Sequence, residues 1–459
     1  MQSLTRAALY WTLLGTSSIA LAEESAVSPR VFSVTTGYFY RQRTDENIAE
    51  PRWPSEKMRS NVIDTVFDMS SGYLQDFVKA DLAWIGAWNF QKDYRCSEVA
   101  FCSQLPDKTL GAVNVWAHND IDGVALAKAA LTFKKSLGST QWQLRGGYDQ
   151  FRGGLLGTNW GFLFPGSYRG LQLEGTLDHL TMSAVWTDAY RTPWATEYGH
   201  FSTPDGLTIK SIESAGLKYV WSGGYYAELA AGQSTDWQKR MLAKVGWQGK
   251  LAEYAAQANY QYYYYKISGK DFVGAEGTYG KQQVVSLESQ IPYAWRLSLE
   301  YVGTTASSWF NVPEFVPRMS AGYGNSQGRL DYWWNAVSDF NKDGEQAFNL
   351  GLHSRTYELA GFGINGGGNL IYASQISGWD TNQARTDSSG FEKGFNLDLN
   401  LECPKGPWQP LSVSVHYTRL RAGGIQLDPT DSHSLFKRYG LYSTDDWKFM
   451  LIYSTAISG

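Results

Sequence analysis

The sequence Leu-Ala-Glu-Tyr-Ala-Ala-Gln-Ala-Asn-Tyr-Gln-Tyr-Tyr-Tyr, residues 251–264, separates into two faces when every second residue is taken. One series is apolar (Ala252, Tyr254, Ala256, Ala258, Tyr260, Tyr262 and Tyr264) and the other contains Glu253, Gln257, Asn259 and Gln261. Successive side chains of a strand point to opposite faces, so this pattern predicts a long strand with one apolar and one polar face. A tilted membrane-spanning strand needs about 9–11 such residues.

Similar segments recur along the chain. Three of the clearest are 180–189, 295–301 and 411–418, where apolar and polar residues alternate. Connections with turn residues, such as 222–224, 248–250 and 291–293, separate some of them, and long polar segments separate others. The pattern predicts an all-β protein, a transmembrane antiparallel β-barrel of about 18 strands (16–18), with short periplasmic turns and long external loops.

The first residues have the features of a secretory signal. Arg6 precedes an apolar run from Ala7 to Leu14, and Ala20-Leu21-Ala22 forms an A-x-A cleavage site. We therefore expect a signal peptide at 1–22, cleaved after Ala22, and one outer-membrane barrel domain at 23–459. The formal net charge of −4 argues against a nucleic-acid partner, which requires a basic surface.

Two further patterns in the sequence are weak. Cys96 and Cys102 are close enough to form a loop disulfide in an oxidising compartment, and two unlinked loop thiols are the alternative. Asp339, Asn341 and Asp343 match the first half of a calcium-binding loop, but Leu350 stands where the bidentate Glu belongs. An irregular turn is the simpler interpretation, and we expect neither a metal nor another cofactor.

A barrel of this size holds a water-filled lumen, so selectivity requires a narrower place built by loops that fold inward. Residues 151–169 are unusually aromatic and Gly-rich for an external loop, and the long segment 304–345 is the second candidate. Mixed charges at inward positions, such as Lys79 with Asp81, suit neutral solutes better than a ladder of cations would.

Several stretches resemble a known family. Gly328-Arg329-Leu330-Asp331-Tyr332-Trp333-Trp334, followed by Ser338-Asp339-Phe340-Asn341, is similar to a segment of the chitoporin branch of the OprD outer-membrane porins. Two further segments of the same branch are similar to Trp160 with residues 165–170, and to residues 186–190 followed by Pro193-Trp194. The similarity covers essentially the whole mature chain. The chain departs from such barrels at its end, Ile457-Ser458-Gly459, which lacks the terminal aromatic residue read by the assembly machinery.

The resemblance implies a substrate-selective diffusion channel for chitin oligosaccharides, in contact with outer-membrane lipid, inserted by the barrel assembly machinery, and monomeric or trimeric. Tryptophan rings offer flat apolar faces to a pyranose ring. The positions that match the family segments and carry suitable side chains form the candidate constriction: Trp160, Arg169, Trp194, Glu197, Arg329, Asp331, Trp333 and Trp334.

Three alternatives stay open at this point. An OprD-type channel could instead carry carboxylates, basic amino acids or peptides. A barrel hydrolase would need a paired nucleophile and base, yet Asp178 and His179 are neighbours that a strand would send to opposite faces. A soluble secreted carbohydrate-binding protein conflicts with the strand pattern.

Overall fold

The computed structural model describes residues 30–47, 56–94, 123–158, 166–193, 195–203, 206–269, 278–307, 314–315, 318–320, 328–379, 385–403, 406, 409–424 and 442–458. Its strands are β1 (Val31–Asn47), β2 (Glu56–Ser70), β3 (Val78–Tyr94), β4 (Gly123–Leu137), β5 (Thr140–Asp149), β6 (Ser167–Leu177), β7 (Leu180–Arg191), β8 (Gly199–Ser202), β9 (Thr208–Ile209), β10 (Ile212–Val220), β11 (Tyr225–Ser234), β12 (Gln238–Leu251), β13 (Tyr254–Ile267), β14 (Tyr279–Ile291), β15 (Trp295–Ala306), β16 (Gln346–His353), β17 (Tyr357–Leu359), β18 (Phe362–Trp379), β19 (Arg385–Glu402), β20 (Leu411–Gly423) and β21 (Tyr442–Ser458).

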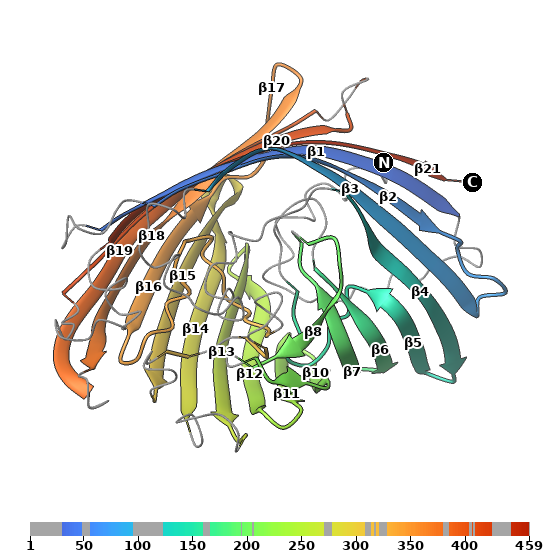
Figure 1. Cartoon of the computed structure of the whole chain (residues 1–459), viewed down its shortest axis with the longest axis horizontal. Helices are drawn as coiled ribbons and strands as arrows, with labels where there is room; N and C mark the ends of the chain where they lie inside the picture. The colour runs from blue at the N-terminus through green and yellow to red at the C-terminus, as the bar shows by residue number, and fades with distance from the viewer. Residues whose placement is uncertain are drawn as a thin grey trace.

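Each main strand pairs antiparallel with its neighbours in the chain, and the ring closes where β1 pairs with β21 from Val31 opposite Ser458 to Asn47 opposite Tyr442. Among the described residues, β8, β9 and β17 are short additions and the other 18 strands form the closed barrel. Figure 1 shows this order, with the colour passing around the wall from blue β1 to red β21 beside it. The predicted fold class is confirmed.

Strand β13 has the predicted outer and inner faces. In β13, Tyr260 is exposed on the outside, whereas Gln261, Tyr263 and Tyr265 face inward and are buried. Its start was predicted wrongly, because Gln248-Gly249-Lys250 belongs to β12 and the tight turn lies at Ala252 and Glu253. Glu253 is therefore a turn residue and does not line the lumen.

The outer face is a band of exposed apolar side chains. Leu229 is 60 % exposed and Leu399 is 52 % exposed, although both lie in regular strands. Such a continuous apolar exterior matches a hydrocarbon environment. No helix among the described residues is long and apolar enough to cross a membrane.

The inner face is polar over most of the wall but not over all of it. Buried inward groups include Asp64, Glu228 and Asn396. On β1–β4, however, a cluster of small and branched apolar residues also faces inward: Phe39, Val62, Val66, Ala83, Ile85, Ala87, Ala125 and Ala127. The lining of the lumen is therefore not uniformly polar.

The outward position of Leu299, near the middle of β15, gives a first test. Replacing Leu299 with Arg should lower the free energy of unfolding in lipid vesicles by about 2–4 kcal/mol, because the charge would lie in hydrocarbon. The Ile457→Arg variant, at the end of β21, should cost no more than about 1 kcal/mol. Equal costs at both positions in urea titrations would contradict a membrane-facing band.

Candidate constriction inside the barrel

Both loops that were predicted to fold inward do so, and they contact each other. The β5–β6 connection and the β15–β16 connection form a short antiparallel bridge between Leu156 and Gly328. Beside it, the Arg329 amide donates to the Leu155 carbonyl at 2.7 Å. The two loops therefore form one unit within the barrel.

The β5–β6 loop is fixed to the wall through its backbone. The Gly154 amide donates to Ser183 Oγ on β7 at 3.1 Å, and the Leu155 amide donates to Ser214 Oγ on β10 at 2.6 Å. Gly154 has φ +55°, and a Cβ there would lie 2.4 Å from Ser214 Oγ, so only glycine fits. Phe151, Leu155 and Leu156 are buried, as expected for an apolar loop packed inside.

Four charged side chains fix the second loop to the adjoining strands of the wall, β11 and β12. The Arg329 guanidinium donates to both oxygens of Asp331, at 2.5 Å each, and pairs with both oxygens of Glu228 on β11. Lys244 on β12 donates to Asp331 at 2.9 Å. Two cations and two carboxylates thus compensate one another where each side chain is at most 18 % exposed.

The pKa shifts of the two loop residues follow from this arrangement. Burial acts to raise the pKa of the Asp331 carboxyl, but Arg329 and Lys244 outweigh burial and hold it well below its ordinary value. Burial likewise acts to lower the pKa of Arg329, and the attraction of Asp331 and Glu228 raises it instead. Asp331 and Arg329 therefore keep their charges at neutral pH, and the ion pair between them remains intact.

Residues a few positions further along contact the other side of the barrel. The Asn335 amide nitrogen donates to Asp398 on β19 at 3.3 Å and lies 2.9 Å from His416 Nδ1 on β20. Lys448 on β21 donates to Asn335 Oδ1 at 3.3 Å. At the nearer end, the Asp331 amide donates to the Tyr263 hydroxyl on β13 at 2.8 Å.

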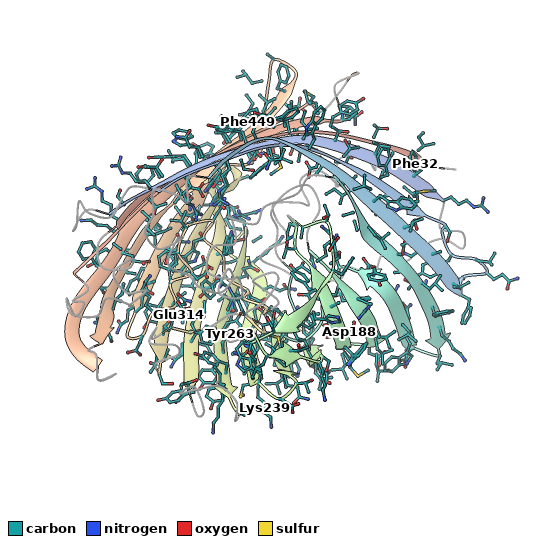
Figure 2. The ribbon with its side chains drawn as sticks, in the orientation of Figure 1. Phe32, Asp188, Lys239, Tyr263, Glu314 and Phe449 are labelled. Atoms are coloured by element: carbon teal, nitrogen blue, oxygen red, sulfur yellow. The ribbon has the colours of Figure 1, made fainter. Side chains whose placement is uncertain are left out.

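We call residues Arg329–Asn335 the crossbar, because they join β11–β13 on one side of the lumen to β19–β21 on the other. Glu314, a described residue nearer the start of the same loop, also contacts β13: its carbonyl accepts from the Tyr265 hydroxyl at 3.0 Å, on the side of the barrel where Figure 2 labels Tyr263 and Glu314. The crossbar is therefore the candidate constriction.

The two tryptophans of the crossbar differ. Trp333 is 49 % exposed, whereas Trp334 is 3 % exposed. The Trp334 ring lies between Tyr332 and Phe340, with ring centroids 5.9 Å and 4.6 Å away, and its carbonyl accepts from Asn396. Trp334 thus holds the loop together, and only Trp333 presents its ring to open space.

Of the remaining expected residues, Arg169 lies away from the crossbar. Arg169 shares the outer face of β6 with Leu171 and pairs with Asp188 at 2.7 Å, so it points away from the lumen. A bulge in β7, where Asp188 is the extra residue, makes this pair possible. Glu197 is exposed in the segment before β8, and Trp160 and Trp194 lie outside the described residues.

Two of the calcium candidates have contacts within the loop, whereas the disulfide candidates are not described. Asp343 accepts the Ala306 amide at 2.9 Å, and the Asn341 side chain donates to the Phe315 carbonyl at 2.8 Å. Both therefore stabilise the loop, and the described residues contain no group of three His, Cys, Asp or Glu suited to a metal. Cys96 and Cys102 lie outside the described residues, and Cys403 is a buried free thiol.

Sequence reasoning missed the wall residues that receive the crossbar: Glu228, Lys244, Tyr263, Asp398 and His416. The alternation in β11 and β12 could have placed Glu228 and Lys244 on the inner face. Nothing in their spacing, however, shows which loop residue lies opposite them.

Comparison with known proteins agrees with this geometry. The family model described as "outer membrane porin, OprD family" matches residues 32–441. The chain belongs to the OprD family of outer-membrane porins. As porins are channels and not enzymes, the hydrolase alternative is excluded, and the chain resides in the outer membrane, where its barrel contacts lipid and passes small solutes.

Individual relatives support the same assignment. The chitoporin of Escherichia coli (strain K12) is 27 % identical over 451 residues, which cover 92 % of this chain and 90 % of that protein. OccAB1 of Acinetobacter baumannii has a TM-score of 0.69 at 16 % identity, covering 95 % of this chain and 98 % of that one. OpdK of Pseudomonas aeruginosa, solved with vanillate, has a TM-score of 0.65 at 14 % identity, with coverages of 93 % and 99 %.

The charge cluster yields a second prediction. Replacing Arg329 with Gln leaves Asp331 and Glu228 without their strongest partner, which should cost about 3–5 kcal/mol of loop docking. Single-channel recordings in a planar bilayer should then show a larger and noisier conductance. The Arg296→Gln variant removes the ion pair between Arg296 on β15 and Glu288 on β14, which is not part of the charge cluster. It should leave the conductance unchanged. An unchanged conductance in the Arg329→Gln variant would contradict the proposal that the crossbar narrows the lumen.

A third prediction concerns pH. Burial raises the pKa of Glu345 to about 8, with Lys342 opposing this effect and Glu392 adding repulsion. Between about pH 4.5 and 8, the folded state keeps this proton and the unfolded state loses it. The free energy of unfolding should therefore fall as pH rises, by at most about 1.4 kcal/mol per pH unit.

Melting temperatures of the detergent-solubilised barrel between pH 5 and pH 8 check this slope. Glu345→Gln should flatten it, whereas Glu358→Gln, at an exposed position in β17, should not. An unchanged slope in the Glu345 variant would show that another group is responsible.

Proposed function

We propose that this OprD-family channel takes up neutral oligosaccharides of the chitin type. The observation that supports the proposal most is the half-exposed Trp333 on a segment that crosses the lumen. An indole face in that position can stack on the apolar side of a pyranose ring as it passes. The relative named chitoporin supports the choice of chitin oligosaccharides among sugars.

The charges around Trp333 also suit an uncharged solute. Arg329, Asp331, Glu228 and Lys244 are committed to one another, and Lys342 pairs with Glu392. Polar groups that are already paired offer hydrogen bonds to hydroxyl and acetamido groups without attracting ions strongly. Weak contacts of this kind let a substrate leave the site as readily as it enters.

One observation favours a second candidate, a channel for small carboxylates. On the β1–β21 wall, Arg41, Arg43 and Lys448 all lie within 4 Å of the single carboxylate of Asp446. This part of the lumen therefore carries excess positive charge. Anionic solutes would be attracted along it, as cationic walls attract anions in other channels.

Current blocks in a planar bilayer distinguish the two candidates. Chitohexaose should cause brief blocks, maltohexaose fewer, and benzoate none. Trp333→Ala should weaken the chitohexaose blocks about 2- to 10-fold, the amount expected for one lost stacking contact. Trp186→Ala, which removes an equally exposed indole on the outer face of β7, is the matched control.

The outcomes are distinct. Blocks by benzoate alone would favour the carboxylate channel. Chitohexaose blocks that persist fully in Trp333→Ala would leave the sugar channel standing but remove Trp333 from its pathway.

A further inference from the structure

Three lysines gather on the outside of the barrel, on three adjacent strands. Lys239 on β12, Lys266 on β13 and Lys281 on β14 are exposed, and both chain neighbours of each are buried or point inward. Because strand side chains alternate, the three ammonium groups project away from the lumen. Figure 2 shows Lys239 at the end of β12, clear of the barrel wall.

The strand register places these like charges side by side. Lys239 lies directly opposite Lys266, and Lys281 lies opposite Tyr264, two residues before Lys266 on the same face of β13. Directly opposed side chains on neighbouring strands have Cβ atoms about 5 Å apart, and like charges in that position are destabilising. The three lysines therefore concentrate positive charge on the outer face, and their mutual repulsion lowers the stability of the strand pairing.

The lysines lack the counter-ions that other outer-face cations have. On that same face Arg169 pairs with Asp188, and Arg419 lies 3.9 Å from Asp445. No described acidic residue forms an ion pair with Lys239, Lys266 or Lys281, and Asp236 in the adjoining turn is exposed without reaching them. Within the part of the chain that the structure describes, the three lysines therefore have no acidic partner.

The position of the lysine cluster along the membrane normal indicates which kind of anion can reach it. The long connections from β13 to β14 and from β15 to β16 lie at this end of the barrel, so the lysines lie at the external side. Tyr264 and Tyr279 lie beside the lysines on the same face, and Lys281 lies 5.4 Å from the Tyr279 ring centroid. Tyrosines on a barrel exterior lie at the headgroup level of the bilayer.

We propose that Lys239, Lys266 and Lys281 bind the phosphate of an outer-leaflet lipid headgroup. Lysine ammonium groups act as point charges and suit a phosphate that approaches from the side. Apolar outward residues continue from the cluster toward the middle of the barrel, including Met241, Val245, Val285 and Leu287, and these fit the acyl chains of the same molecule. A free phosphate ion would use the lysines but gain nothing from this apolar surface.

Native mass spectrometry of the full chain in non-ionic detergent tests the proposal. A phosphate-bearing lipid such as phosphatidic acid should remain bound in preference to phosphatidylcholine. The Lys239→Gln/Lys266→Gln variant should weaken retention about 20-fold, since each lysine near an anionic lipid contributes about a fivefold effect. The Lys239→Arg/Lys266→Arg variant should retain it.

The Lys135→Gln/Lys250→Gln variant is the matched control, because it removes the same charge from exposed positions at the opposite end of β4 and β12. It should bind as the unaltered chain does. Equal loss in both Gln pairs, equal retention of phosphatidylcholine, or saturation of the site by inorganic phosphate would each overturn the proposal.

Discussion

A backbone in hydrocarbon must satisfy every N–H and C=O group within the protein, and the rest of this structure depends on that constraint. The pairing of β1 with β21 along 17 residues removes the last free sheet edge. Once the ring is closed, the two-residue period of each strand divides all side chains into an outer and an inner set. The apolar exterior, the lumen and the lysine cluster on the outer rim all follow from this division.

The crossbar shows how a wide barrel becomes a narrow channel without adding a domain. A loop that enters the lumen brings polar backbone and charges into a confined space, so it needs partners on the wall. Arg329 and Asp331 find them in Glu228 and Lys244, and Asn335 finds them in Asp398 and His416. Charge compensation thus positions the loop and also leaves Trp333 as the exposed apolar surface in the passage.

The sequence predicted the barrel well because the fold depends on a short-range pattern, the alternation of apolar and polar residues within each strand. Alternation within single strands and the contrast between tight and long connections need no knowledge of distant contacts. The error at the β12–β13 turn has a local cause: Gly249 resembles a turn residue, whereas the chain turns at Ala252 in a left-handed conformation, φ +55°.

The site was less predictable, since loops do not follow the strand period. Trp333 and Trp334 are neighbours with the same side chain, and only packing against Tyr332 and Phe340 decides that Trp334 is buried. Arg169 was expected at the constriction because it lies in a segment that resembles the family, but the bulge at Asp188 gives it a partner on the outer face. Both outcomes depend on contacts between segments far apart in the sequence.

The most direct test of the account is chemical access to the crossbar. A Trp333→Cys variant, with Cys96, Cys102 and Cys403 replaced by Ser, would be treated with a bulky charged thiol reagent during single-channel recording. We expect an immediate fall in conductance, and no fall when the cysteine instead replaces Phe348 on the outer face of β16. Complete modification of Cys at position 333 with unchanged conductance would show that the crossbar does not lie in the conducting path.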